Sequence, residues 1–407
     1  MLKAALYDPY LDTLGGGERY CLTVAEILIK NGYSVDLFWS GNPDLIKKAQ
    51  ERFNLDIDKI KIVPDIFHLS PNKIELVEDT SSIKNISSST QLSQNPLNKA
   101  LNFINRIKTL RNYDLAFYLS DGSLPFLFSK KNLLHIQVPF TRLPSSPKDK
   151  LVNFLKLSGY HSIICNSKFT QRFTKRHLPK KTTVLYPPVD IEKFSPSKNK
   201  ENIILSVGRF DNILNAKKQD ILLSAFQKLH AQNKHSNWKL VLAGGSLENP
   251  DRNLYLQHLK QMAKGLPVDF VVSPKFEDLK KLYSISKIYW HAAGYEVNEE
   301  ENPENTEHFG MTVVEAMASG LVPLVVAKGG LTEIITDEEN GYLWHSQSEL
   351  ISKTQLLMAS PNLLDRFMEN SLSSIKKYSK SEFEKEFLAL ISWKSQSLSP
   401  TGTVFHC

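Results

Sequence analysis

The chain has 407 residues, of which 41% are hydrophobic and 23% are charged, a balance typical of a soluble globular protein of two domains. No segment approaches the ~18 uninterrupted apolar residues of a membrane-spanning helix, and the N-terminal stretch meets Asp8 too early for a secretory signal. Three widely spaced cysteines form neither a metal-ligand pattern nor a disulfide framework, so we expect a cytoplasmic protein.

The net charge of +7 is unevenly distributed along the chain. Residues 1–195 hold 27 Lys+Arg against 18 Asp+Glu, whereas the remainder has a small acidic excess. The basic residues are densest between Arg172 and Lys181. This cluster predicts either a solvated helix face or a surface for an anionic membrane or a lipid-phosphate acceptor. A nucleic acid is the least favoured partner, and we expect none.

Strand-like runs alternate with helix-like stretches along the whole chain. In the first half the runs lie near residues 3–7, 34–39, 114–119, 133–138, 162–165 and 183–186. In the second half they lie near residues 202–207, 239–243, 268–272, 287–291 and 321–327. Several are apolar at nearly every position, as expected of parallel strands covered on both faces. The alternation predicts an α/β protein with two doubly wound, Rossmann-like parallel sheets.

A proline-bearing and then polar stretch, 187–200, marks the predicted domain boundary. We therefore expect an N-terminal acceptor-side domain at 1–195 and a donor-binding domain at 196–380. A last helix, 381–393, is expected to pack back on the first domain, and a tail at 395–407 is expected to be disordered. The Ser-, Asn- and Gln-rich stretch 81–96 is predicted to be a mobile excursion.

The segment from Glu307 to Gly320 is the most informative part of the sequence. It predicts a loop, a helix that Gly310 opens and a glycine stop, followed by the strand run at 321–327. Free N–H groups at the start of such a helix, together with its dipole, favour a phosphate. Because carboxylates repel phosphate, we expect Glu307 and Glu315 to accept hydrogen bonds from hydroxyl groups on either side of it. A phosphate flanked by hydroxyl-bearing groups describes a nucleotide sugar.

A second glycine-rich loop, Gly15, Gly16 and Gly17, follows the first strand and precedes a helix expected near residues 19–30. The dinucleotide fingerprint requires a glycine where this chain has Tyr20, and the Gly-Lys-Ser/Thr of a Walker A loop is absent. The loop therefore either faces a phosphate or sugar in another way or is a purely structural turn.

Gly208 and Arg209 end the first strand of the second half, and Lys217 and Lys218 open the next helix. A guanidinium and an ammonium group suit a diphosphate, whose charge grows as it leaves a nucleotide sugar. The sequence leaves open which of the two lysines binds. Gly244 belongs to a further glycine turn at a strand end, where ligands of open α/β sheets bind.

His135 lies near the end of an apolar strand run, so it either touches the donor sugar or acceptor hydroxyl or belongs to the core. Asp56 and Asp58 form a D-x-D sequence in a charged stretch, 51–61, that we expect to be helical. Because metal-binding D-x-D pairs of transferases follow a buried strand, we expect no metal ion here.

These motifs together resemble family-4 retaining glycosyltransferases of the GT-B fold, and they are most similar to the lipid-linked-oligosaccharide mannosyltransferases. The resemblance covers most of the chain and is strongest from residue 203 to residue 343. It rests on Glu307 and Glu315 with seven residues between them, the loop 15–19, Gly208-Arg209 with Lys217, the segment 166–170, and Asn340-Gly341.

The resemblance implies two doubly wound domains that face a cleft, with no metal ion or other cofactor required. Glu315 would bind the ribose hydroxyls, Glu307 would contact the donor sugar, and His135 would lie near the reacting sugar. Arg209 and Lys217, or Lys218, would hold the diphosphate. The remaining implied donor-binding residues are Gly15, Gly16, Gly17, Gly208, Gly244, Phe309, Gly310, Met311 and Thr312.

The sequence thus predicts a retaining hexosyltransferase that uses a GDP-sugar or UDP-sugar, with mannose favoured. The predicted acceptor is a glycan or lipid-linked acceptor at the cytoplasmic membrane face. Two alternatives remain open. A nucleotide-sugar epimerase or hydrolase of the same architecture would convert the donor alone, and a non-catalytic sugar-nucleotide binding module would bind the donor without turnover.

Overall fold

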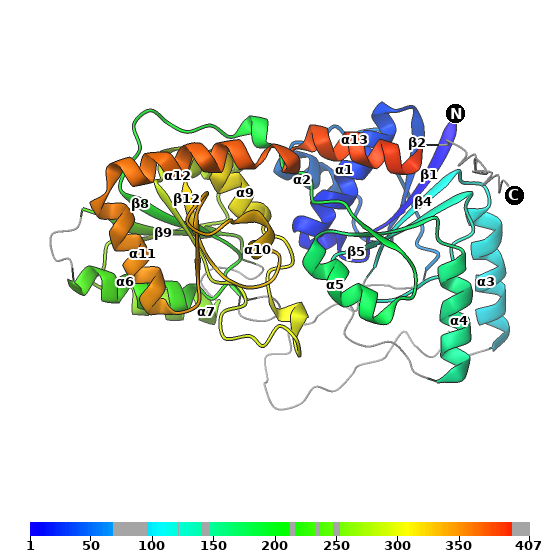
Figure 1. Cartoon of the computed structure of the whole chain (residues 1–407). Coiled ribbons are helices and arrows are strands. Elements are labelled where there is room, and N and C mark those ends of the chain that lie inside the picture. Colours follow the sequence, from blue (N-terminus) through cyan, green and yellow to red (C-terminus); the bar gives the residue numbers. More distant parts are fainter. Residues whose placement is uncertain are drawn as a thin grey trace, which may run out of the picture.

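The computed structural model has two α/β domains, each built on one parallel sheet, which confirms the predicted fold class (Figure 1). The predicted mobile stretch up to residue 95 and the tail after residue 395 lie outside the described residues. The structure describes residues 1–67, 96–120, 122–139, 146–211, 216–232, 237–246 and 253–392.

The first sheet has seven strands in the described residues, in the order β3-β2-β1-β4-β5-β6-β7. Their bounds are β1 Leu2–Tyr7, β2 Tyr33–Phe38, β3 Lys61–Val63, β4 Leu115–Ser120, β5 Lys131–Ile136, β6 Ser162–Cys165 and β7 Thr182–Val184. The helices of this domain are α1 Gly16–Lys30, α2 Asp44–Phe53, α3 Pro96–Leu110, α4 Pro147–Ser158 and α5 Lys168–His177.

The second sheet has six strands in the described part of the chain, in the order β10-β9-β8-β11-β12-β13. Their bounds are β8 Ile203–Val207, β9 Lys239–Gly244, β10 Val268–Val272, β11 Ile288–His291, β12 Val322–Val326 and β13 Tyr342–Trp344. The helices that follow β7 are α6 Gln219–Gln232, α7 Leu254–Met262, α8 Phe276–Ile285, α9 Met311–Ala318, α10 Leu331–Ile334, α11 Gln347–Ala359, α12 Pro361–Ser374 and α13 Lys380–Ile391.

Every described strand pair runs parallel, and the central strands β4 and β8 are buried along their whole length. The strand order reverses between β1 and β4 in the first sheet and between β8 and β11 in the second. Open α/β sheets bind ligands beyond the carboxyl ends of the strands at such reversals. The loops that follow β1 and β8 are therefore the places to look for a site, and both carry predicted glycine motifs.

The last helix, α13, crosses back from the second domain to the first (Figure 1). Its residues Phe383, Phe387 and Ile391 lie in the same buried cluster as the apolar face of α1. Lys380 at its start forms an ion pair with Glu26 of α1. The first domain is thus completed by residues that follow the second in sequence.

The predicted strand runs all correspond to strands, but β3 and β13, each three residues long, were not predicted. The prediction of a helix over 51–61 was wrong. Helix α2 ends at Phe53, because Asn54 adopts a left-handed φ of +50°, and β3 begins at Lys61. None of the described helices is both long enough and apolar enough to cross a bilayer.

Candidate functional site

Glu307 is the centre of a charged group at the carboxyl end of the second sheet. Its Oε2 accepts hydrogen bonds from Lys217 Nζ at 2.6 Å and from His291 Nε2 at 3.0 Å. Burial raises the pKa of Glu307, but the charge of Lys217 and the bond from His291 more than offset this, so the pKa lies well below its ordinary value. The carboxylate is therefore ionised and accepts hydrogen bonds only.

Lys217, rather than Lys218, reaches this group. Gly208 makes room for it, since a Cβ at position 208 would stand 2.6 Å from Lys217 Cγ. Lys218 has a left-handed φ of +54° just before α6, and its side chain forms no ion pair with the described residues. The structure thus favours Lys217 as the lysine of the site.

Arg209, which follows β8, lies at the same edge of the sheet. Its Nε is 3.2 Å from Asp211 Oδ2, and its side chain keeps 37% of its surface exposed. Lys217 and Arg209 are therefore each neutralised by a carboxylate of the second domain. Two cations beside one sheet end provide the charge that a diphosphate requires.

Glu315 lies one turn inside α9, and it joins the two domains. Its Oε1 accepts a hydrogen bond from Arg19 Nη1 of α1 at 2.6 Å, and its Oε2 accepts one from Tyr283 at 3.2 Å. Both side chains of the ion pair are largely buried, with 13% of Arg19 and 9% of Glu315 exposed. Glu315, which is predicted to accept hydrogen bonds from the ribose, is thus held by Arg19 of the opposite domain.

The start of α9 has the geometry predicted for a phosphate site. Gly310 has a φ of +112°, and a Cβ there would stand 2.8 Å from Leu331 Cδ2, so glycine is required on both counts. The N–H groups of Met311 and Thr312 open the helix and have no partner within it. The Phe309 ring is buried against Tyr186 and Tyr378, which leaves only its backbone for a ligand.

The glycine loop of the first domain faces this helix end. Gly15 is the N-cap of α1, and its N–H donates to Glu18 Oε2 at 2.5 Å, so Glu18 rather than a ligand satisfies it. Gly16 and Gly17 belong to the first turn, and the helix begins three residues earlier than the start predicted at residue 19. A Cβ at Gly16 would stand 3.3 Å from the sulfur of Met311. The first turns of α1 and α9 therefore meet at the domain interface.

The structure places His135 in the core rather than beside this interface. The side chain is fully buried, and its ring stacks on Tyr20 with 3.9 Å between centroids. Burial lowers the pKa of His135 to about 3, so the ring is neutral. The reason is position along the strand, because β5 continues for another residue past His135 before it ends.

Gln137, two residues after His135, borders the glycine loop of the first domain. It lies just beyond the end of β5, and a Cβ at Gly17 would overlap its side-chain amide. Gln137 therefore lies against the glycine loop of α1, although no sequence motif predicted it. The position of Gln137 was predictable in principle, because the residue that follows the end of a strand projects from the sheet edge, whereas a residue within the strand does not.

Gly244 and Arg52 complete the surroundings of the site. The carbonyl of Gly208 occupies the place of a Cβ at Gly244, so this glycine allows the ends of β8 and β9 to approach. Arg52 of α2 reaches within 3.9 Å of a Cβ at Gly245, which brings a cation of the first domain to the glycine turn of the second. Burial lowers the pKa of Arg52, and nearby Glu18 opposes that effect. No sequence motif marked Arg52.

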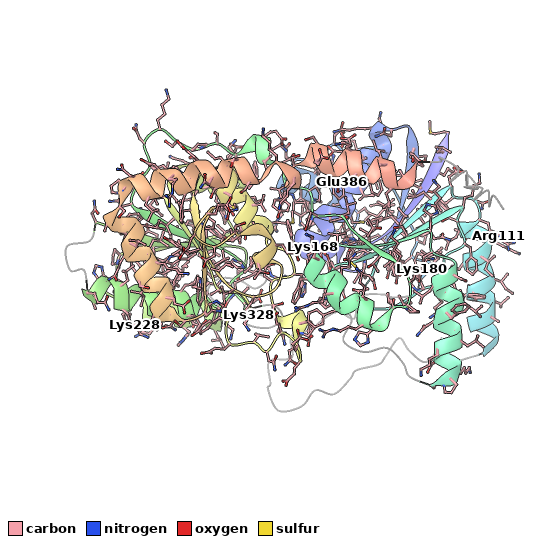
Figure 2. All side chains as sticks on the ribbon, viewed as in Figure 1. Arg111, Lys168, Lys180, Lys228, Lys328 and Glu386 are labelled. Atoms are coloured by element: carbon pink, nitrogen blue, oxygen red, sulfur yellow. The ribbon has the colours of Figure 1, made fainter. Side chains whose placement is uncertain are left out.

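Acidic residues of the second domain hold α5 of the first. The backbone N–H groups of Lys168 and Phe169, which open α5, donate to the carboxylate of Glu333 at 2.9 Å and 2.6 Å. Lys168 marks this junction in Figure 2. Arg172 and Arg176 pair with Glu299 and Glu300. Part of the basic cluster predicted at 172–181 thus serves domain contact.

The D-x-D sequence lies away from the site. Asp56 and Asp58 belong to the turn between α2 and β3, where the Asp56 N–H donates to Glu26 and Asp58 accepts from Gln50. Within the described residues, no group of three or more His, Cys, Asp or Glu side chains has an arrangement suited to a metal ion.

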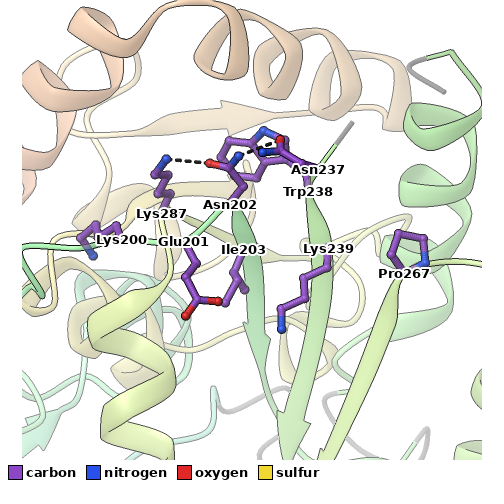
Figure 3. Close-up of a pocket in the computed structure, with 9 residues that line it drawn as sticks. All are labelled: Lys200, Glu201, Asn202, Ile203, Asn237, Trp238, Lys239, Pro267 and Lys287. Atoms are coloured by element: carbon purple, nitrogen blue, oxygen red, sulfur yellow. Dashed lines mark hydrogen bonds between the residues drawn. The ribbon is translucent and has the colours of Figure 1, made fainter. Parts of the chain in front are cut away.

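A cavity lies at the opposite, amino-terminal edge of the second sheet (Figure 3). Its lysines already have partners. Lys200 donates to the carbonyls of Ser284, Ser286 and Ser319, and Lys287 donates to Asn202. Burial lowers the pKa of Lys200 to about 7. This cavity is separate from the interface of α1 and α9, and nothing ties it to the predicted donor site.

Both halves of the chain are similar to known glycosyltransferases. Residues 189–373 match the family model described as "Glycosyl transferases group 1". A "GDP-Man:Man(3)GlcNAc(2)-PP-Dol alpha-1,2-mannosyltransferase" of Xenopus laevis is 29% identical over 222 residues, which cover 51% of this chain and 43% of the relative. The chain thus spans less than half the length of that relative.

Two further proteins match along nearly the whole chain. An "Uncharacterized glycosyltransferase" of Haemophilus influenzae is 23% identical and covers 91% of this chain and 94% of its own length. The crystal structure of a glycosyltransferase from Rickettsia africae is similar with a TM-score of 0.68 at 17% identity, covering 96% of this chain and 97% of that one. Residues 189–373 of this chain are thus similar to glycosyl transferases group 1, and the whole chain has the two-domain GT-B fold.

Proposed function

We propose that this protein is a retaining hexosyltransferase that moves a sugar from a nucleoside-diphosphate donor to a hydroxyl of a glycan or lipid-linked acceptor. The observation that carries the proposal is the arrangement around α9. Glu307 and Glu315 flank the free N–H groups of Met311 and Thr312, and Lys217 lies beside Glu307. Carboxylates that accept hydrogen bonds from hydroxyl groups on both sides of an anion site fit a nucleotide sugar.

The donor's parts are assigned to these residues by their chemistry. The helix N–H groups, Lys217 and Arg209 would hold the diphosphate, since all of them donate hydrogen bonds and favour negative charge. Glu315 would accept the ribose hydroxyls, and Glu307 would accept a hydroxyl of the transferred sugar. Lys217 already contacts Glu307, so one lysine would bridge the sugar side and the phosphate side of the donor.

The chemical step would proceed on one face of the sugar. The acceptor oxygen bonds to the anomeric carbon as the bond from that carbon to the diphosphate oxygen breaks, and the departing phosphate takes the acceptor's proton. The leaving group gains negative charge in this step, so Arg209 and Lys217 bind the transition state more tightly than the ground state. His135 takes no part, because its ring is enclosed in the core.

Mannose is the favoured sugar, and GDP-mannose is therefore the first donor to test. The name of the Xenopus laevis relative, a GDP-mannose-dependent mannosyltransferase, supports this choice. The match covers 51% of this chain and 43% of that relative. UDP-sugars remain in the test panel, because none of the described contacts identifies the base.

A lipid-linked acceptor also requires a surface that meets a membrane, and α3 and α4 supply one. The two helices lie side by side in Figure 1, and both reach Phe126, through Phe103 of α3 and Lys156 of α4. They expose large apolar side chains, namely Leu101, Phe103, Ile104, Leu151, Phe154 and Leu155. Exposed lysines and arginines flank them, namely Lys108, Arg111, Lys148 and Lys150. Apolar insertion together with basic charge favours an anionic bilayer.

Transfer is tested by incubating the protein with GDP-mannose or a UDP-sugar, with and without a lipid-linked glycan panel, and identifying products by mass spectrometry. Acceptor-dependent transfer that keeps the anomeric configuration is expected, and Glu307→Gln should abolish it. Conversion of the donor without an acceptor would instead identify an epimerase or hydrolase. Donor binding without turnover across the panel would identify a binding module.

Membrane binding is tested by sedimentation with vesicles that contain phosphatidylglycerol. We expect binding that weakens with salt and that Phe154→Ser reduces. Leu254→Ser is the matched control, because Leu254 is 78% exposed on α7 of the second domain. Equal sedimentation of the two variants would contradict the assignment of this surface.

A further inference from the structure

The ion pair between Arg19 and Glu315 conflicts with the role proposed for Glu315 in binding the donor ribose. Glu315 is the proposed acceptor for the ribose hydroxyls, yet Arg19 Nη1 lies 2.6 Å from its Oε1 and the Tyr283 hydroxyl donates to its Oε2. Both of its oxygens are thus engaged by the protein itself. A neutral hydroxyl must compete with a guanidinium, whose hydrogen bond to a carboxylate is charge-assisted and therefore stronger.

Displacing Arg19 has a cost unless another anion accepts it. Only 13% of its side chain is exposed, so the released guanidinium would be a poorly solvated charge without a partner. Glu18 is next to it in sequence but is occupied by the N–H of Gly15. In the described part of the chain, Glu315 is the one carboxylate with which Arg19 forms an ion pair.

The position of Arg19 indicates which anion replaces Glu315. Arg19 lies in the second turn of α1, and Gly16 in the first turn lies against Met311 at the start of α9. The free N–H groups of α9 begin at that same residue. A diphosphate bound at α9 would therefore lie beside the first turns of both helices, within the reach of a long guanidinium side chain.

We propose that Arg19 is an exchangeable counter-ion that makes the site selective for a nucleoside diphosphate over a nucleoside. Without a donor, Arg19 binds Glu315 and joins the two domains. When the donor enters, its ribose takes Glu315 and its diphosphate takes Arg19. A nucleoside without phosphate releases Arg19 but offers it no replacement. This inference rests on the proposed donor site at α9 and adds the residue that couples its two halves.

A fixed interdomain clasp is the competing explanation, and it predicts a different result. If Arg19 only held the domains together, its loss would weaken every ligand of the interface by the same factor. If Arg19 is exchanged, its loss removes a competitor for the nucleoside and a partner for the diphosphate. The affinities for the two ligands then change in opposite directions.

The experiment is isothermal titration of the full chain with GDP, guanosine, UDP and uridine, on wild type, Arg19→Gln and Arg19→Lys. For the base that binds, Arg19→Gln should weaken the diphosphate at least tenfold and leave nucleoside affinity unchanged or raised. Arg19→Lys keeps the charge without the planar fork, so its selectivity should fall between those of wild type and Arg19→Gln. Lys228→Gln, at an exposed position of α6 in the outer part of the second domain (Figure 2), is the control and should change neither affinity.

Equal weakening of nucleoside and diphosphate by Arg19→Gln, or no effect on either, would overturn the exchange. If Arg19→Gln does not fold, Arg19→Lys provides the test. A ratio of diphosphate affinity to nucleoside affinity equal to that of the wild type would also overturn the exchange. Failure of the proposed function is a separate result. In that case neither the wild-type protein nor its Arg19 variants would bind GDP or UDP.

Discussion

The ion pair between Lys217 and Glu307 provides the sharpest test of the geometry around the donor site. The two groups are 2.6 Å apart, and only 18% of the lysine side chain and 13% of the glutamate side chain are exposed. Removing one partner of a buried pair leaves an uncompensated charge, at a cost of about 3–5 kcal/mol, whereas replacing both by apolar side chains is often nearly neutral.

The perturbation is therefore a double-mutant cycle of Lys217→Met and Glu307→Leu. Partial exposure favours the lower end of the range, so Lys217→Met should lower the free energy of unfolding by about 3 kcal/mol. Glu307→Leu should cost about 4 kcal/mol, because it also removes the partner of His291. The double variant should lose about 4–5 kcal/mol rather than the roughly 7 kcal/mol of additive losses, which is a coupling energy of about 2–3 kcal/mol.

The assay is urea unfolding followed by tryptophan fluorescence, since Trp238, Trp290 and Trp344 all lie in the core of the second domain. The matched control is the pair Lys280 and Glu277, which is also 2.6 Å apart but has 35% and 73% of its side chains exposed. The same substitutions there should couple by less than about 0.5 kcal/mol. Additive losses in the Lys217 and Glu307 cycle would refute the buried pair.

Four further predictions concern the donor site, the metal requirement and pH. Glu315→Ala should weaken donor binding by about 1–3 kcal/mol, as measured by titration. Arg209→Ala should lower kcat in the transfer assay. An unchanged kcat would count against the proposed binding of the leaving diphosphate by Arg209. Full transfer activity is expected in excess EDTA, and a loss that Mg²⁺ restores would contradict metal independence. The folded-state pKa of His135 is depressed to about 3, so the unfolded chain takes up a proton there first, and the stability from the neutral ring is lost as pH falls below about 6.5. Relative to its value at pH 7.5, this loss is about 2 kcal/mol at pH 5, and His135→Phe should remove it; urea unfolding at the two pH values measures the difference, and an unchanged pH dependence would show that the ring is not buried in solution.

Local patterns were enough to predict the fold class and most of the strands. Parallel strands covered on both faces require continuous apolar runs, and such runs are visible without any knowledge of their neighbours. The same holds for the start of α9, where Gly310 and the two glutamates are close in sequence. The three-residue edge strand β13 was not predicted, whereas the equally short β7 was, because its apolar run continues to Tyr186.

Contacts between distant segments could not be predicted in the same way. The pairing of Arg19 with Glu315 joins residues 296 positions apart, and nothing in either local sequence specifies it. The choice of Lys217 over Lys218 depends on the room that Gly208 leaves beside it. His135 lies in the core, which is one of its two predicted positions, and the sequence could not decide between them because the point at which a strand ends depends on the neighbouring strands.

The sequence alone therefore determined the alternation of strands and helices, the helix-opening glycine and the kinds of charge near it, since these follow from neighbouring residues. Only the tertiary structure decided which charges meet, that Gln137 and Arg52 border the site, and that α13 completes the first domain. The physical reason is that burial and ion pairing depend on distances between segments, which are fixed when the two sheets and their helices pack together.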